Sequence, residues 1–161
     1  MKTTPHITLF LLFNFALVQF LFPQKIDHSQ IYEKIESTIT NINLILGRDC
    51  KMEFDQELIV TFYQKGILFR QDRVYLDALD PNKVCYIPEE KSVSVQCMEF
   101  KGLKGNLSKR YGKGCIGREL VKVQSKSTCT RITLPVMEAD TGELKTELEN
   151  LIRLGHVLIF K

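Results

Sequence analysis

Four of the five cysteines of this chain lie between residues 85 and 129, and covalent bridges among them would fix much of its topology. Cysteines oxidise in exported proteins and stay reduced in the cytosol, so the compartment decides whether such bridges form. Pairing neighbours would close two short loops, each contributing about 3 kcal/mol in the chain-entropy model. Spacing alone leaves the pairing among Cys85, Cys97, Cys115 and Cys129 open, and an odd count leaves one cysteine over, Cys50.

The N-terminus predicts export. Met1-Lys2 is a short positive segment, and residues 7–22 form an apolar run interrupted only by Thr8, Asn14 and Gln19. Such a run suits a secretory signal and is short for a membrane span, which needs about 20 apolar residues. We predict a signal peptide over residues 1–24 and a secreted, extracellular protein. The alternative is an uncleaved signal anchor, because no small-x-small cleavage pattern is present.

The rest of the chain is long enough for one domain with a real core, which disulfides would reinforce rather than replace. Its positive charge is concentrated in residues 97–129, where eight lysines and arginines face two glutamates. This asymmetry predicts a basic face that could bind an anionic polymer or lipid surface. The alternative is an ordinary solvated loop. The candidate anion-binding residues are Lys101, Lys104, Lys109, Arg110 and Lys113.

Two further features bear on this basic segment. The tripeptide Asn106-Leu107-Ser108 is a glycosylation signal, and a sugar on Asn106 would crowd the charges. Tyr111 is the only aromatic residue among the charges of residues 101–113, whereas single-stranded nucleic acid binding needs several stacking rings. We therefore do not expect a nucleic acid partner.

The hydrophobic pattern predicts a helix at each end. After the capping residue Asp27, apolar residues recur every three or four positions until Gly47. A second helix is predicted from Asp140-Thr141 to a stop at Gly155, with residues 135–161 as a helical extension. The two apolar stripes consist of Ile31, Ile35, Ile39, Ile42 and Leu46, and of Leu144, Leu148, Leu151 and Ile152.

Strand-like segments separated by short turns fill the region between the helices. Asp80-Pro81-Asn82-Lys83 has the composition of a type I turn, and residues 88–91 and 125–127 are further expected turns. Successive strands without intervening helices indicate an antiparallel meander, and hence an α+β fold with the N-terminal helix packed on the sheet. The predicted strands are 58–63, 67–69, 73–79, 84–87, 92–100, 118–124 and 128–134.

The order of the helix, strands and cysteines, together with several short sequence segments, resembles that of the secreted cystatin superfamily over about residues 29–134. VYLD at 74–77 leads towards Cys85, and SKST at 125–128 precedes Cys129, as in cystatins. CMEFK at 97–101 and KGCIG at 113–117 are similar to the cathelin-like domain of cathelicidin precursors and chemerin. We therefore expect a cystatin/cathelin-like domain over residues 25–134.

The resemblance implies a disulfide pairing and a class of function. Members of the superfamily pair the first cysteine with the second and the third with the fourth. This implies Cys85–Cys97 and Cys115–Cys129, and leaves Cys50 free for a core position or a dimer link. Host defence, antimicrobial activity or extracellular signalling through a protein receptor is the implied role.

Cysteine-protease inhibition is an alternative that the sequence disfavours. Inhibitory cystatins insert an uncharged Gln-x-Val-x-Gly loop and a Pro-Trp loop into the protease cleft, and this chain has no Trp. Its first loop falls at residues 67–71, which lack the motif, and Gln64-Lys65-Gly66 is short and displaced.

The residues needed for catalysis are poorly placed in this sequence. His28 and His156 lie near opposite ends, no Cys-x-x-Cys pair is present, and no glycine-rich phosphate loop joins a strand to a helix. We expect a non-enzymatic protein with no catalytic residue, metal or cofactor. A glycosaminoglycan- or membrane-binding protein is the remaining alternative.

Overall fold

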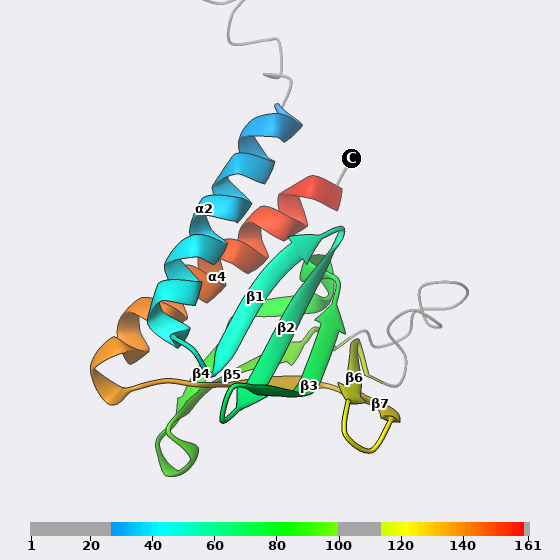
Figure 1. Ribbon diagram of the computed structural model, residues 1–161. Helices are drawn as coiled ribbons and strands as arrows, with labels where there is room; N and C mark the ends of the chain where they lie inside the picture. Colours follow the sequence, from blue (N-terminus) through cyan, green and yellow to red (C-terminus); the bar gives the residue numbers. More distant parts are fainter. Residues whose placement is uncertain (1–26, 100–113, 160–161) are drawn as a thin grey trace, which may run out of the picture.

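The computed structural model describes residues 27–99 and 114–159, which form two long helices and two antiparallel sheets (Figure 1). The predicted α+β class is confirmed. The expected signal segment, residues 1–24, lies outside the described residues. Within the described residues, neither helix has the length and apolar character of a membrane span.

Helix α2, His28–Leu46, follows the predicted apolar repeat. The Asp27 carboxylate accepts the backbone N–H of Ser29 at 3.0 Å and so caps the first turn. Gly47 ends the helix with a φ of 67°, a left-handed conformation that glycine adopts without a steric cost. The five apolar residues of the stripe are all buried where α2 packs against α4 and β1, which confirms the predicted helix.

The first sheet has five strands in the order β1-β2-β3-β6-β7, and the second has three in the order β4-β5-β8. All neighbours are antiparallel, as expected, and the first sheet consists of β1 Cys50–Asp55, β2 Glu57–Gln64, β3 Ile67–Val74, β6 Ile116–Leu120 and β7 Ser125–Cys129. The second sheet consists of β4 Leu79–Ile87, β5 Ser92–Cys97 and β8 Arg131–Pro135. Three short 3-10 turns connect elements: η1 Leu76–Ala78, η2 Pro88–Glu90 and η3 Glu138–Asp140.

Three local predictions are wrong for identifiable reasons. The strand expected at 73–79 is interrupted by η1, because the chain leaves the first sheet at Val74 and enters the second at Leu79. The turn expected at 80–83 is an irregularity within β4, where the pairing register with β5 shifts between Leu79 and Val84. The turn expected at 125–127 is a strand, because β7 pairs with β6 there and the chain reverses at 121–124 instead.

Helix α4, Thr141–Ile159, buries the predicted stripe and belongs to the same core as α2. The predicted stop at Gly155 is wrong, since the helix continues through it. A Cβ at this position would overlap the side chain of Leu76 in η1, so the glycine permits close packing rather than ending the helix. His156, on the next position, donates from Nε2 to the carbonyl oxygen of Leu79 at 2.9 Å.

Asn43 of α2 closes the free edge of β1. Its Oδ1 accepts the backbone N–H of Met52 at 2.6 Å, and its Nδ2 donates to the carbonyl of the same residue at 2.9 Å. The side-chain amide thus satisfies the two backbone groups that a neighbouring strand would otherwise bind.

A cluster of three charged side chains, Asp72, Arg70 and Arg118, joins the two sheets, and we call it the ionic seam. In the second sheet, Cys97 N–H donates to Thr130 O and Val136 N–H donates to Lys91 O. The ladder alternates, so the carbonyls of Arg131 and Thr133 on β8 point away from β5. Arg118 Nη2 donates to the carbonyl oxygen of Arg131 at 3.3 Å, and Arg70 Nη2 donates to the carbonyl oxygen of Thr133 at 3.4 Å.

Asp72 supplies the countercharge in this seam. Its carboxylate is fully buried and accepts Nε and Nη2 of Arg118 at 2.9 and 2.8 Å, with Arg70 Nη2 at 3.5 Å. These hydrogen bonds raise the pKa of Arg118, whereas burial lowers the pKa of Arg70, whose guanidinium also stacks 3.5 Å from the centre of the Phe62 ring. The two arginines and one aspartate replace the backbone pairing that would otherwise hold β8 to the first sheet.

Candidate functional site

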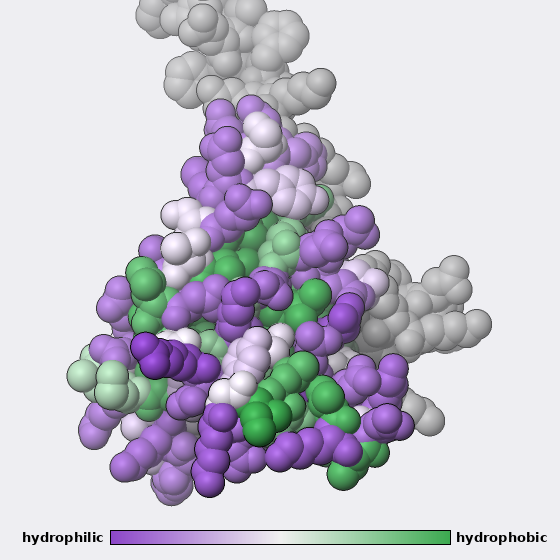
Figure 2. Space-filling model, in the orientation of Figure 1, coloured by the Kyte–Doolittle hydropathy of each residue, from purple (hydrophilic) through white to green (hydrophobic). Residues whose placement is uncertain are grey.

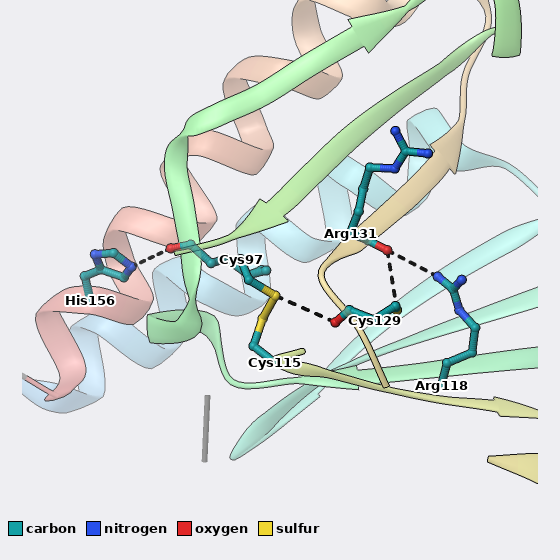
Figure 3. The surroundings of a disulfide bond; sticks show 7 residues. Cys97, Cys115, Arg118, Cys129, Arg131 and His156 are labelled. Carbon is teal, nitrogen blue, oxygen red and sulfur yellow. Dashed lines mark hydrogen bonds between the residues drawn. A yellow bond between two sulfur atoms is a disulfide. The ribbon is translucent and has the colours of Figure 1, made fainter. Parts of the chain in front are cut away.

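The disulfide in the described part of the chain joins Cys97 to Cys115, which corrects the implied pairs Cys85–Cys97 and Cys115–Cys129 (Figure 3). It links the end of β5 to the residues that precede β6, and so ties the second sheet to the first. A bridge closing a loop of this size contributes about 3 kcal/mol. Cys50, Cys85 and Cys129 are free thiols.

The alternation of side chains along strands explains why Cys85 and Cys97 do not pair. Cys85 lies opposite Ser94, so these two side chains share a face of the second sheet. Cys97 is three positions further along β5 and points to the other face with Val93 and Val95. The two thiols therefore lie on opposite faces, although their spacing in the sequence suggests adjacency.

The same alternation keeps Cys115 and Cys129 apart. Cys129 lies opposite Ile116, and alternation places residue 115 on the other face. The half-buried Cys129 thiol instead donates to Arg131 O at 3.5 Å, and burial raises its pKa (Figure 3).

The remaining thiols differ in exposure. Cys50 is buried at the start of β1, and burial raises the pKa of its thiol to about 12. A dimer through Cys50 stays a prediction, and it would require β1 to open. Cys85 is exposed and is the most accessible of the three free thiols.

The predicted anion-binding residues and the glycosylation signal cannot be placed. Lys101, Lys104, Lys109, Arg110, Lys113 and Asn106 all lie outside the described residues. In the sequence this segment lies between β5 and β6, and the Cys97–Cys115 bridge joins the described residues on either side of it.

Two hairpin turns lie side by side at one end of the first sheet, and we call them the hairpin rim: residues 64–67 between β2 and β3, and residues 121–124 between β6 and β7. Antiparallel pairing of β3 with β6 brings them together, and Val121 N–H donates to Phe69 O at 3.0 Å. Lys65 and Gly66 both have positive φ, as a two-residue hairpin turn of type I′ requires. Gln124 has a φ of 49° and donates its N–H to Val121 O, which closes the second turn.

The hairpin rim exposes apolar side chains next to positive charges. Ile67, Val121 and Val123 are 58%, 38% and 68% exposed, and Lys65 and Lys122 flank them at the turns. Figure 2 shows apolar side chains at the lower edge of the molecule, where these turns lie. Exposed apolar side chains that cluster, with a polar border, are typical of a protein-binding surface.

The ionic seam positions the hairpin rim. Arg70 and Arg118 lie on the two strands that carry the turns, and both are anchored to Asp72 and to β8. The turns therefore project from strands fixed on their inner face, as a preorganised binding edge requires.

Sequence reasoning found half of the hairpin rim. The predicted strands 58–63 and 67–69 leave a turn at residues 64–66, and the structure places the turn between β2 and β3 there. The second turn was missed, since Val121-Lys122-Val123 has strand-like composition and only the pairing of β7 with β6 reveals it.

Comparison of the chain with family models, curated proteins and solved structures gives no match.

Proposed function

We propose that this chain is a secreted, non-enzymatic binding protein that docks to a protein partner through the hairpin rim, in host defence or extracellular signalling. The observation that carries the proposal is the juxtaposition of the two turns with their three exposed apolar side chains. The cystatin-like order of the sequence supports the role in defence or signalling by resemblance.

The chemistry of the hairpin rim defines the partner that would fit it. Covering the exposed parts of Ile67, Val121 and Val123 would favour binding by about 1 kcal/mol each, because they are already partly buried. Lys65 and Lys122 add long-range attraction to acidic groups. We therefore propose a partner with an apolar cleft bordered by carboxylates.

Paired variants test this proposal. The chain carrying Ile67→Ser and Val123→Ser is immobilised and exposed to the extracellular fluid of the source, beside the wild type and a Leu44→Ser control. Leu44 is 78% exposed on α2 and is not part of the hairpin rim. We expect a protein retained by the wild type and the control but lost from the double variant. Equal recovery on the double variant would rule out the hairpin rim as the docking surface.

Cysteine-protease inhibition is a second candidate, favoured by one observation. Two hairpin turns side by side at one end of a sheet are what the cystatin resemblance implies for an inhibitory wedge. Lys65 and Lys122 oppose it, because each would carry a charge towards an apolar cleft. A papain inhibition assay decides between the candidates: the wedge requires inhibition that the double variant loses.

Binding of an anionic polymer or lipid surface stays a prediction for the basic segment, residues 101–113. Elution from heparin at low salt would contradict it.

A further inference from the structure

A cleft of about 300 Å³ lies where α2 ends and η3 leads into α4, and we call it the helix cleft (Figure 1). Figure 2 shows apolar side chains at the surface on this side of the molecule. The helix cleft shares no residue with the hairpin rim, so it is a surface separate from that of the proposed function. Its lining consists of Asn41, Leu44, Ile45, Met137, Asp140 and Glu143.

Two large apolar side chains of the helix cleft face solvent. Leu44 lies on α2 outside the buried stripe and is 78% exposed, and Met137 is 72% exposed. Ile45 is half-buried and packs against the core, so it joins the exposed pair to the interior. A single exposed apolar side chain is ordinary, whereas a group of them in a concave surface is typical of a binding site.

Hydrogen bonds fix the backbone on both walls of the helix cleft. The carbonyl oxygen of Met137 accepts the backbone N–H of Asp140 at 3.0 Å and the hydroxyl of Thr141 at 3.4 Å. On the other wall, the Asn43 amide ties the last turn of α2 to Met52 of β1. A ligand therefore meets a surface that is already formed, which lowers the ordering cost of binding.

The charges of the helix cleft are all negative. Residues 41–47 and 136–144, which build its two walls, contain Glu138, Asp140 and Glu143 but no lysine or arginine. Neither Asp140 nor Glu143 forms an ion pair within the described residues. The cleft therefore favours a cationic ligand and disfavours an anionic one.

The stability of α4 explains only part of this arrangement. Carboxylates near the N-terminus of a helix are favoured by the helix dipole, so Asp140 and Glu143 suit the start of α4 without any ligand. The dipole gives no reason for the exposure of Leu44, which lies on α2, or of Met137, which precedes η3. A ligand that is both apolar and basic accounts for the two features together.

We infer that the helix cleft binds a basic segment of another protein, in which large apolar side chains alternate with lysine or arginine. The apolar side chains would cover Leu44, Ile45 and Met137, and the cations would lie against Asp140 and Glu143. Methionine suits such a site, because its unbranched side chain adapts to the shape of a ligand. The preference of the helix cleft is opposite in charge to that of the hairpin rim, which favours an acidic partner.

Three peptides, each acetylated and amidated, test the inference by isothermal titration calorimetry on the purified full chain: Lys-Leu-Lys-Leu-Lys, Lys-Ser-Lys-Ser-Lys and Glu-Leu-Glu-Leu-Glu. We expect the Lys-Leu peptide to bind about 10-fold or more tightly than the Lys-Ser peptide, because its leucines are removed from water. The Glu-Leu peptide should bind more weakly than the Lys-Leu peptide, because like charges repel. The affinity for the Lys-Leu peptide should fall as salt is added.

Methyl NMR of the methionines locates the bound peptide. Met137 lies in the helix cleft, whereas Met52 is buried in β1 and serves as an internal reference. We expect the Lys-Leu peptide to shift the Met137 methyl signal, assigned through Met137→Leu, and to leave the Met52 signal unchanged.

One pair of substitutions tests the apolar contacts. Leu44→Ser with Met137→Ser should weaken binding of the Lys-Leu peptide about 10-fold, because both exposed apolar side chains are lost. Ile67→Ser with Val123→Ser alters only the hairpin rim and should leave peptide binding unchanged. Circular dichroism checks that each variant is folded.

A second pair tests the charges. Asp140→Asn with Glu143→Gln should weaken binding of the Lys-Leu peptide about 2- to 10-fold and reduce its dependence on salt. The matched control is Glu53→Gln with Asp55→Asn, which removes the same charge from two exposed carboxylates of β1 outside the cleft. This control should change neither the affinity nor its dependence on salt.

Several results would overturn the inference. These are equal affinities for the Lys-Leu and Lys-Ser peptides, equally tight binding of the Glu-Leu peptide, or an unshifted Met137 methyl signal in the complex. An affinity that survives Asp140→Asn with Glu143→Gln, or no binding of any peptide to the folded protein, would overturn it as well. The retention experiment on the hairpin rim is read separately, so either proposal can fail while the other stands.

Discussion

Replacing Asp72 by Asn tests the ionic seam, since the side chain keeps its size and loses its charge. The carboxylate is fully buried and accepts two hydrogen bonds from Arg118 at 2.8 and 2.9 Å. Asparagine can accept one of these and turns an N–H donor towards the guanidinium. Arg118 and Arg70 would then be left together without a countercharge.

The expected loss of folding free energy on Asp72→Asn follows from the burial of the Asp72 carboxylate. Removing one partner of a buried ion pair costs about 3–5 kcal/mol, because the remaining charge is desolvated without compensation. A domain of this size has a free energy of unfolding of about 5–15 kcal/mol, so Asp72→Asn should remove a large part of it. The corresponding fall in melting temperature is about 10–20 °C.

Urea denaturation followed by circular dichroism measures the change, and Glu53→Gln is the matched control. Glu53 forms an ion pair with Lys51 at 2.7 Å, as short as the Asp72–Arg118 contact, but both partners are more than half exposed. The control should leave the urea midpoint unchanged, because water already screens the pair. A loss below about 1 kcal/mol for Asp72→Asn would refute the assignment of the seam as the link between the sheets.

Two further substitutions probe the core. Gly155→Ala should destabilise the protein by about 1–3 kcal/mol in urea denaturation, because the added methyl group overlaps Leu76; a stabilised variant would mean that α4 shifts freely. Burial keeps Cys50 protonated in the folded protein up to a pKa of about 12, above its ordinary value, so folded-state stability should fall as pH rises above about 9. Cys50→Val should flatten that fall between pH 8 and 10.5, and an unchanged slope would contradict the role of this thiol.

The elements that the sequence predicted well are those set by local periodicity. The isoleucines of α2 and the leucines of α4 repeat at helical spacing, and Asp27 and Gly47 mark the ends of α2 by their own side-chain and backbone chemistry. These signals need no knowledge of distant residues, so the two helices and the α+β class were predictable.

The errors arise where long-range pairing decides. Whether Cys97 faces Cys85 or Cys115 depends on strand register, and a shift of one residue moves a side chain to the other face. Gly155 was interpreted as a stop because the sequence does not show that Leu76 lies against it. The hairpin rim combines a recognisable turn with one that only the β6–β7 pairing reveals.

Mass spectrometry of the native protein, digested without reduction, is the most direct test of the Cys97–Cys115 bridge that ties the two sheets together and of the proposal that the protein is exported. We predict an N-terminus near residue 25, a peptide pair linked through Cys97 and Cys115, and alkylatable thiols at Cys85, Cys129 and, after unfolding, Cys50. Bridges Cys85–Cys97 and Cys115–Cys129 in the native protein would contradict the strand registers and the fold built on them.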